Sequence, residues 1–144
     1  MIRVGEAVRP DVRYIQRHGA YAVLLRGNSV LLTHQAEPVP EVQLPGGGID
    51  PGESPLTALH REVREETGWS IANPRRLGAF RRFTYMPEYD LWAEKICHVY
   101  LARPSLQHGP PTEAGHTALW ASPDVAIDLV DNEGDLRFLQ QLFL

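Results

Sequence analysis

The chain has 144 residues, 43% of them hydrophobic and 22% charged, which suits one folded domain and excludes a wholly disordered chain. Fourteen basic and 18 acidic residues give a net charge of −4, so the composition offers no broad attraction to nucleic acid or to an anionic membrane. Cys97 is the only cysteine, which excludes an intrachain disulfide and a cysteine-based zinc site. No apolar run is long enough for a signal peptide or a membrane span. We therefore expect a single cytoplasmic domain over residues 1–144.

The first part of the chain predicts short strands, at residues 21–25, 30–33 and 42–44. A glycine-containing turn at 27–29 joins the first two strands into a hairpin. Two prolines predict a loop between residues 35 and 41. The three glycines at 46–48 should end the third strand, because glycine permits backbone conformations that other residues avoid.

The clearest helix signature lies between Ser54 and Gly68. Ser54 is a good N-cap, Pro55 suits the first helical position, and Gly68 suits the position just beyond a helix end. Apolar residues recur at helical spacing and predict one buried stripe, formed by Leu56, Leu59 and Val63.

The remaining segments predict further strands at residues 77–85, 95–102 and 118–120. Glycine and proline predict a loop at 107–115. Residues 134–144 should form a final amphipathic helix, with an inner face made of Leu136, Leu139, Leu142 and Phe143. Strands with interleaved helices indicate a mixed α/β layered fold.

Three glutamates share one face of the helix that follows Ser54. At about 100° per residue, Glu62, Glu65 and Glu66 fall within a sector of about 100°. Their mutual repulsion would vanish if a divalent cation lay among them, and Mg²⁺ and Mn²⁺ prefer such oxygen ligands. The alternative is a solvated helix face whose charge Arg61 and Arg64 offset.

The residues around this face match a known family signature. Gly47 is followed after five residues by Glu53, and seven residues later by the run Arg61-Glu62-Val63-Arg64-Glu65-Glu66-Thr67-Gly68-Trp69. At every defined position, residues 47–69 resemble the signature of the Nudix hydrolases. The resemblance implies an α/β fold, a Nudix-type α/β/α sandwich around a mixed β-sheet.

The resemblance also implies an activity, the metal-dependent hydrolysis of a pyrophosphate bond in a nucleoside diphosphate linked to another moiety. Mg²⁺, or alternatively Mn²⁺, would be the cofactor, held by Glu62, Glu65, Glu66 and the backbone carbonyl of Gly47. Glu53 would orient the helix start or the attacking water, and Arg61 would hold the carboxylates in place. Candidates for the general base are Glu53, Glu66, Glu113 and His116, although the last two are also ordinary surface residue types for a loop.

Substrate contacts should lie outside the signature. Tyr85 resembles the tyrosine that marks Nudix hydrolases of diadenosine polyphosphates, and its ring would stack on adenine or else pack within its strand. Arg81 and Arg82 should point to opposite faces of a strand, so at most one reaches substrate phosphate, and we assign that contact to Arg81. The pair 131–132 is better interpreted as a helix cap than as a contact to a purine edge.

Three functions fit these features. The first is hydrolysis of a small nucleotide, such as a dinucleoside polyphosphate. The second is a nucleotide-pool sanitising or nucleotide-sugar pyrophosphohydrolase. The third is a nucleotide-sensing domain that binds without cleaving, which the complete set of glutamates disfavours. We expect a small-molecule nucleotide as partner and no membrane, the sequence carries no strong nucleic-acid signal, and the resemblance leaves a homodimer open.

Overall fold

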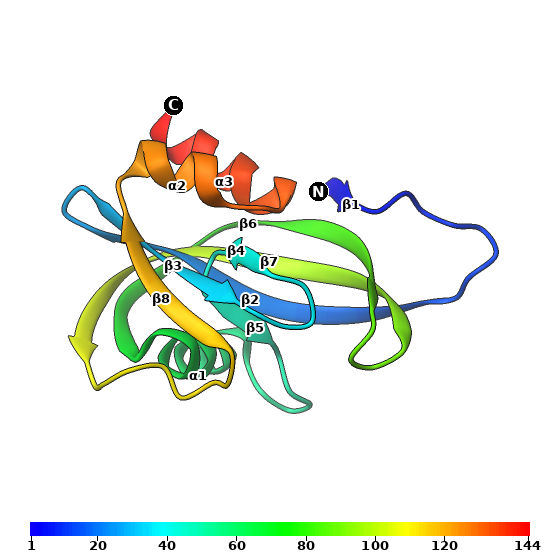
Figure 1. Ribbon diagram of the computed structural model, residues 1–144, viewed down its shortest axis with the longest axis horizontal. Coiled ribbons are helices and arrows are strands. Elements are labelled where there is room, and N and C mark those ends of the chain that lie inside the picture. The colour runs from blue at the N-terminus through cyan, green and yellow to red at the C-terminus, as the bar shows by residue number, and fades with distance from the viewer.

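In the computed structural model, which describes residues 1–144, one sheet lies between helices on its two faces (Figure 1). The strands are β1 (Ile2–Gly5), β2 (Tyr14–Arg26), β3 (Ser29–Gln35), β4 (Glu41–Gln43), β5 (Gly46–Gly48), β6 (Trp69–Met86), β7 (Leu91–Gln107) and β8 (His116–Ala121). The helices are α1 (Pro55–Thr67), α2 (Pro123–Leu129) and α3 (Glu133–Phe143). None of them is long and apolar enough to cross a membrane.

The sheet is mixed, as predicted. Its strand order is β1-β6-β7-β2-β3-β4, while β5 pairs with β2 and β8 pairs with β3. The pairs β1·β6 and β2·β7 are parallel, and the other pairs are antiparallel. Strand β2 therefore contacts three partners along its length, and it brings β5 and the start of α1 to the middle of the sheet.

Alternate residues of β2 enter two separate cores. Ala22 and Leu24 pack with Leu59 and Val63 of α1 on one face. Val23 packs on the other face, in the core that α3 covers. Because side chains of a strand point alternately to its two faces, one apolar strand can supply both cores. The α/β/α arrangement predicted from the sequence is confirmed.

Helix α1 begins and ends where the sequence predicts. The Ser54 side chain accepts a hydrogen bond from the Thr57 backbone N–H, and Gly68 ends the helix with a φ of 81°. The predicted stripe is wrong at one position, because Leu56 is 42% exposed. Residues 54–57 are all exposed, so the first turn of the helix lies at the surface.

Other elements differ from the prediction in extent. Strands β6 and β7 are much longer than predicted, and β1 and α2 were not predicted at all. The three glycines form β5 instead of only ending a strand. Helix α3 is capped by Asn132, whose side chain accepts from the Asp135 backbone N–H, so the capping interpretation is confirmed.

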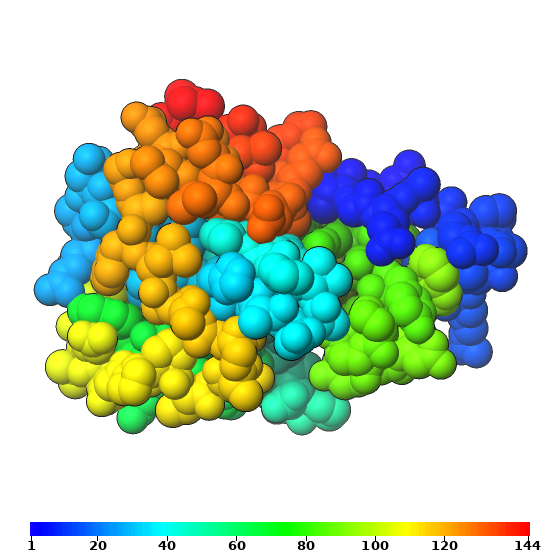
Figure 2. Space-filling view, viewed as in Figure 1, coloured from blue at the N-terminus to red at the C-terminus, as the bar shows by residue number.

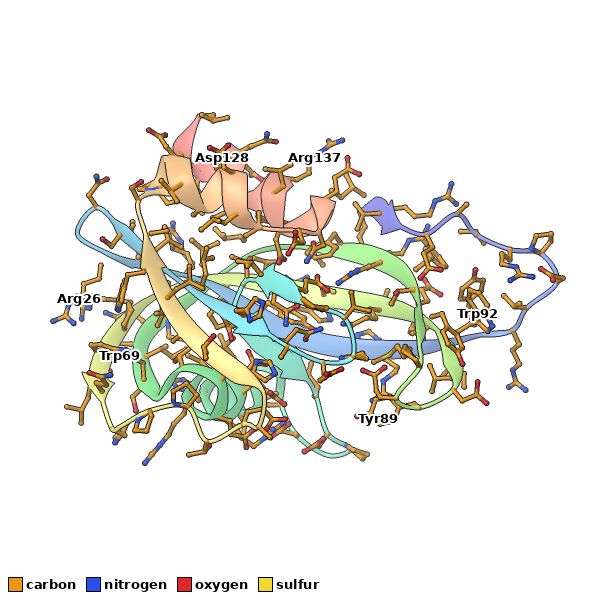
Figure 3. The ribbon with its side chains drawn as sticks, viewed as in Figure 1. Arg26, Trp69, Tyr89, Trp92, Asp128 and Arg137 are labelled. Carbon is orange, nitrogen blue, oxygen red and sulfur yellow. The ribbon has the colours of Figure 1, made fainter.

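The two ends of the sheet carry aromatic residues with different surroundings. Trp69 and Arg26 lie at one end, and Tyr89 and Trp92 lie at the other (Figure 3). The Trp69 ring packs edge-on against Trp120 and lies beneath the Arg26 guanidinium, 5.2 Å away. Trp69 therefore completes the core under α1.

Candidate active site

The glycine strand β5 brings the signature helix close to the backbone of the sheet. Gly47 pairs with Ala20 of β2, and the carboxylate of Glu62 lies directly against it. A Cβ atom at Gly47 would lie only 2.5 Å from Glu62 Oε2. Glycine is thus required at this position because it leaves room for the carboxylate.

Arg61 is the centre of a network of carboxylates on α1 and the loop before it. Its Nε and Nη2 donate to the two oxygens of Glu53, both at 2.8 Å. Its Nη1 donates to Glu62 Oε1 at 2.9 Å and to Glu65 Oε2 at 3.4 Å, and Nη2 also donates to the Gly48 carbonyl. The bonds from Arg61 lower the pKa of Glu53 to about 2, so that carboxylate is ionised at neutral pH.

Glu66 is the most deeply buried carboxylate of the set, with 5% of its surface exposed. Its Oε1 accepts from the Gly46 backbone N–H at 3.0 Å, and its Oε2 lies 3.5 Å from His116 Nδ1. Burial raises the pKa of Glu66 well above its usual range and also raises the pKa of Glu62. Burial lowers the pKa of His116, which favours the neutral imidazole.

The oxygen donors on this face suit a hard divalent cation. Glu62, Glu65 and Glu66 come from neighbouring turns of α1, and a cation among them would offset the cost of burying their charge. No three Asp, Glu, His or Cys side chains converge into a ready-made coordination shell. Glu62 and Glu65 contact the Arg61 guanidinium instead, and Glu66 contacts the Gly46 N–H.

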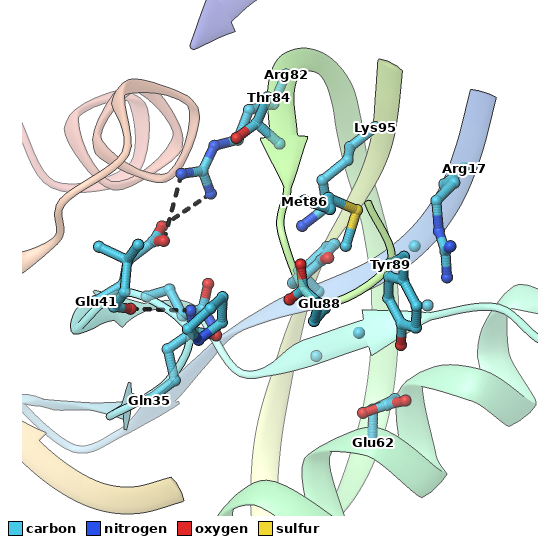
Figure 4. Close-up of a pocket in the computed structure, with 18 of the residues that line it drawn as sticks. Arg17, Gln35, Glu41, Glu62, Arg82, Thr84, Met86, Glu88, Tyr89 and Lys95 are labelled. Carbon is cyan, nitrogen blue, oxygen red and sulfur yellow. Dashed lines mark hydrogen bonds and ion pairs between the residues drawn. The ribbon is translucent and has the colours of Figure 1, made fainter. Parts of the chain in front are cut away.

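A cleft of about 510 Å³ opens beside these carboxylates. It lies between β4 with the loop before it and the β6–β7 turn. In the space-filling view the β4 region (cyan) lies below the start of α3 (orange-red) and beside the β6–β7 turn (green) (Figure 2). Its lining includes three basic side chains and three tyrosines, namely Arg17, Arg82, Lys95, Tyr21, Tyr85 and Tyr89. Glu62 faces these groups from α1 (Figure 4).

The structure brings some of the predicted site residues into this cleft and leaves others outside it. The predicted residues that line it are Gly47, Glu62, Glu66 and Tyr85. Arg61 and Glu65 border a second hollow of about 400 Å³ beside the loop at 108–112. Glu113 is exposed and lines neither, although its backbone N–H donates to the Glu65 carbonyl at 2.9 Å.

The structure places Arg82 in the lining of the cleft, and it does not place Arg81 there, although the phosphate contact was assigned to Arg81. Neighbouring residues of β6 point to opposite faces, as predicted, but the cleft lies on the Arg82 face. Arg81 instead pairs with Glu94 at 3.4 Å. Arg82 donates to Glu41 at 2.8 Å across the cleft (Figure 4).

Tyr85 is placed both to contact a ligand in the cleft and to pack against its neighbours, the two roles considered from the sequence. It lines the cleft, yet its hydroxyl donates to Asp90 and its ring packs against Trp92, with 5.0 Å between ring centroids. Arg17 and Lys95 also line the cleft, and the sequence carried no local signal for either. Their meeting depends on the pairing of β2 with β7.

Comparison with known proteins agrees with this architecture. The model of the NUDIX domain family matches residues 16–142. A Bacillus subtilis protein with the name "Putative 8-oxo-dGTP diphosphatase" is 36% identical over 78 residues, which cover 54% of this chain and 52% of that protein. The CMP-5'-(N-acetyl-N-hydroxy-3-aminopropyl)phosphonate hydrolase of Streptomyces rubellomurinus is 34% identical over 90 residues, covering 61% of this chain and 41% of that protein.

The matched segments thus span about half or less of these curated relatives. A solved NUDIX hydrolase from Nitrosomonas europaea shares the fold, with a TM-score of 0.71 and 19% identity, over 89% of this chain and 88% of that one. The family match extends far beyond residues 47–69, and it includes the strands that form the cleft. The chain belongs to the Nudix hydrolase family.

Proposed function

We propose that the chain is a metal-dependent hydrolase of a pyrophosphate bond in a small nucleotide, specifically a nucleoside diphosphate linked to another moiety. The observation that carries the proposal is the carboxylate face of α1, where Glu62 and Glu66 line a cleft large enough for a nucleotide. The names of two relatives, a diphosphatase and a hydrolase of a CMP derivative, support this substrate class.

The cofactor in this proposal is Mg²⁺, with Mn²⁺ as the alternative. It would be held by Glu62, Glu65, Glu66 and the backbone carbonyl of Gly47. When bound, it supplies charge that neutralises phosphate oxygens and makes the attacking water more acidic. Hard oxygen donors of this kind are the ligands that both cations prefer.

Arg61 and Glu53 act as positioning residues in this proposal. Their paired hydrogen bonds, both at 2.8 Å, fix the guanidinium beside Glu62 and Glu65. Glu53 also accepts from the Asp50 backbone N–H at 3.0 Å, which ties the loop before α1 to the same network. With its pKa near 2, Glu53 is poorly suited to take a proton at neutral pH.

The general base is proposed to be Glu66 or Glu113. Glu66 lines the cleft and has His116 as its neighbour, whereas Glu113 lies in the loop whose backbone is bonded to α1. Tyr85 is proposed to stack on the base of the substrate, because its ring lines the same cleft.

Glu66→Gln is the sharpest test, because the amide keeps an oxygen acceptor for the Gly46 N–H while it removes the charge. We expect its turnover with Mg²⁺ to fall by about three orders of magnitude or more, with the fold unchanged by circular dichroism. Glu133→Gln, an exposed glutamate of α3, is the control. An active Glu66→Gln would contradict the proposed site, and a loss of similar size in Glu113→Gln would assign the base to Glu113.

The substrate alternatives are separable in one experiment. The nucleotide products of hydrolysis would be measured by ion-exchange chromatography from a dinucleoside polyphosphate, an oxidised nucleoside triphosphate and a nucleotide sugar, with and without Mg²⁺. Turnover that requires Mg²⁺ identifies an enzyme, and the preferred compound identifies its class. Binding across the panel without any turnover would instead indicate the nucleotide-sensing alternative.

A further inference from the structure

Three basic side chains form a row across three adjacent strands of the sheet. Arg82 of β6 is the register partner of Lys95 of β7, and Lys95 is in turn the register partner of Arg17 of β2. Register partners point to the same face of a sheet, and neighbouring strands are about 4.8 Å apart, so the row spans about 10 Å. In Figure 4, Arg82, Lys95 and Arg17 come from neighbouring strands at one side of the cleft, and Arg82 is turned toward Glu41.

Only one charge of this cationic row is neutralised by an ion pair. Arg82 pairs with Glu41 at 2.8 Å, whereas neither Lys95 nor Arg17 has a carboxylate oxygen within 4.0 Å. The ammonium of Lys95 lies 5.9 Å from the centre of the Tyr21 ring, and the Arg17 guanidinium lies 4.6 Å from that of Tyr89.

Aromatic faces attract these cations but carry no net charge. The Arg82–Glu41 pair leaves two of the three positive charges of the row, those of Lys95 and Arg17, without a paired carboxylate. Like charges on paired strand positions repel each other, so the row is suited to an anionic ligand. Glu6 and Glu88 line the same cleft and keep their negative charge, but neither forms an ion pair with the row. Glu6 accepts from Thr84 Oγ1 and from the Tyr85 backbone N–H instead.

The cationic row shares its cleft with Glu62 and Glu66 of α1. A nucleotide whose scissile pyrophosphate lies at α1 would therefore place further phosphates toward Lys95 and Arg17. We infer that the row of Arg17, Lys95 and Arg82 binds phosphate groups beyond the scissile pyrophosphate. This inference rests on the proposed function, and it makes the preferred substrate a small nucleotide with three or more phosphates, such as a nucleoside triphosphate or a dinucleoside polyphosphate, instead of a nucleotide sugar.

Binding of inorganic tripolyphosphate, measured by calorimetry without divalent cations, tests the row separately from catalysis. We expect Arg17→Gln and Lys95→Gln each to weaken binding about tenfold or more, because each removes a charge-assisted contact. Lys95→Arg should retain most of the affinity. Arg103→Gln is the matched control, because this exposed residue also lies on β7 and its substitution removes the same charge outside the cleft. Equal losses in the control and the cleft variants would overturn the inference, as would unchanged binding in the cleft variants.

Substrate preference is then measured with Mg²⁺. Arg17→Gln and Lys95→Gln should raise KM about tenfold for a nucleoside triphosphate, a dinucleoside tetraphosphate or both, and leave KM for a nucleoside diphosphate sugar unchanged. The compound whose KM rises more, the nucleoside triphosphate or the dinucleoside tetraphosphate, is the one whose extra phosphates contact the row. An equal rise for all three compounds would overturn the inference. If the unaltered protein hydrolyses none of them, the proposed function fails, while the tripolyphosphate measurement still decides whether the row binds phosphate.

Discussion

Adding a single methyl group at Gly47 should lower the activity strongly and leave the stability nearly unchanged. In Gly47→Ala, the new Cβ would lie 2.5 Å from both Cδ and Oε2 of Glu62, whereas ordinary contact begins near 3.4 Å. The Glu62 carboxylate must therefore move by about 0.9 Å. The moving atoms are the end of a flexible side chain, so the free energy of unfolding should change by less than about 1 kcal/mol.

The effect on catalysis should be much larger, because a displacement of about 1 Å at a reacting centre costs about 100-fold in rate. We therefore expect kcat with Mg²⁺ to fall about 100-fold in Gly47→Ala. The neighbouring residue provides the control, because a Cβ at Gly48 would meet nothing within 4 Å. Gly48→Ala changes the same strand by the same group, and it should keep nearly full activity.

Steady-state kinetics and urea unfolding of both variants would be compared. Equal activity in Gly47→Ala and Gly48→Ala would refute the conclusion that catalysis requires the Glu62 carboxylate at its position against the backbone of β5. A large loss of stability in Gly47→Ala would also refute the reasoning, because it would mean that the surrounding backbone, and not the Glu62 side chain, absorbs the clash.

Two predictions concern stability. Burial raises the pKa of Asp135 from 3.8 to about 7, so the folded state binds this proton more tightly than the unfolded state. The ionisation of Asp135 should therefore lower the free energy of unfolding by up to about 4 kcal/mol as the pH rises from 4 to 7, and Asp135→Asn should remove this contribution and make the slope in urea titrations shallower; an unchanged slope would refute the contribution of Asp135. Gly68→Ala should destabilise by about 2 kcal/mol or more, because its φ is 81° and its Cβ would overlap the Gly109 carbonyl. Gly27→Ala also has a positive φ but open space around it, so equal losses in urea unfolding would exclude the overlap as the cause.

Helix α1 was predictable because all of its signals are local. Ser54, Pro55 and Gly68 fix its ends, and the spacing of its apolar residues fixes its inner face. Helix α2 carries the same kind of signal, with Ser122 as N-cap and a proline at the next position, so it too could have been found from the sequence. Only the exposure of Leu56 needed the structure, because the spacing of apolar residues does not say which turns of a helix are covered.

The cleft was less predictable, because it depends on pairing between distant segments. The sequence indicates that Arg81 and Arg82 face opposite ways, but it contains nothing that says which face of β6 carries the cleft. The facing of residues in β6 is harder to predict because its pairing with β7 has register irregularities between residues 70 and 78 of β6. The meeting of Lys95 with Arg17 is likewise a property of the parallel pairing of β2 with β7.

The short strand β5 links the acidic wall of the cleft to its basic wall. Its residues pair with Gly19 to Tyr21 of β2, and the same strand carries Arg17 two residues earlier. The Gly46 N–H also donates to Glu66, so the ladder that holds β5 places the α1 carboxylate as well. A slip of one residue turns every side chain of a strand to the other face. The register of β5 on β2 therefore determines the position of the α1 carboxylates relative to the cationic row. A nucleotide with several phosphates could then contact both walls without any movement of the sheet.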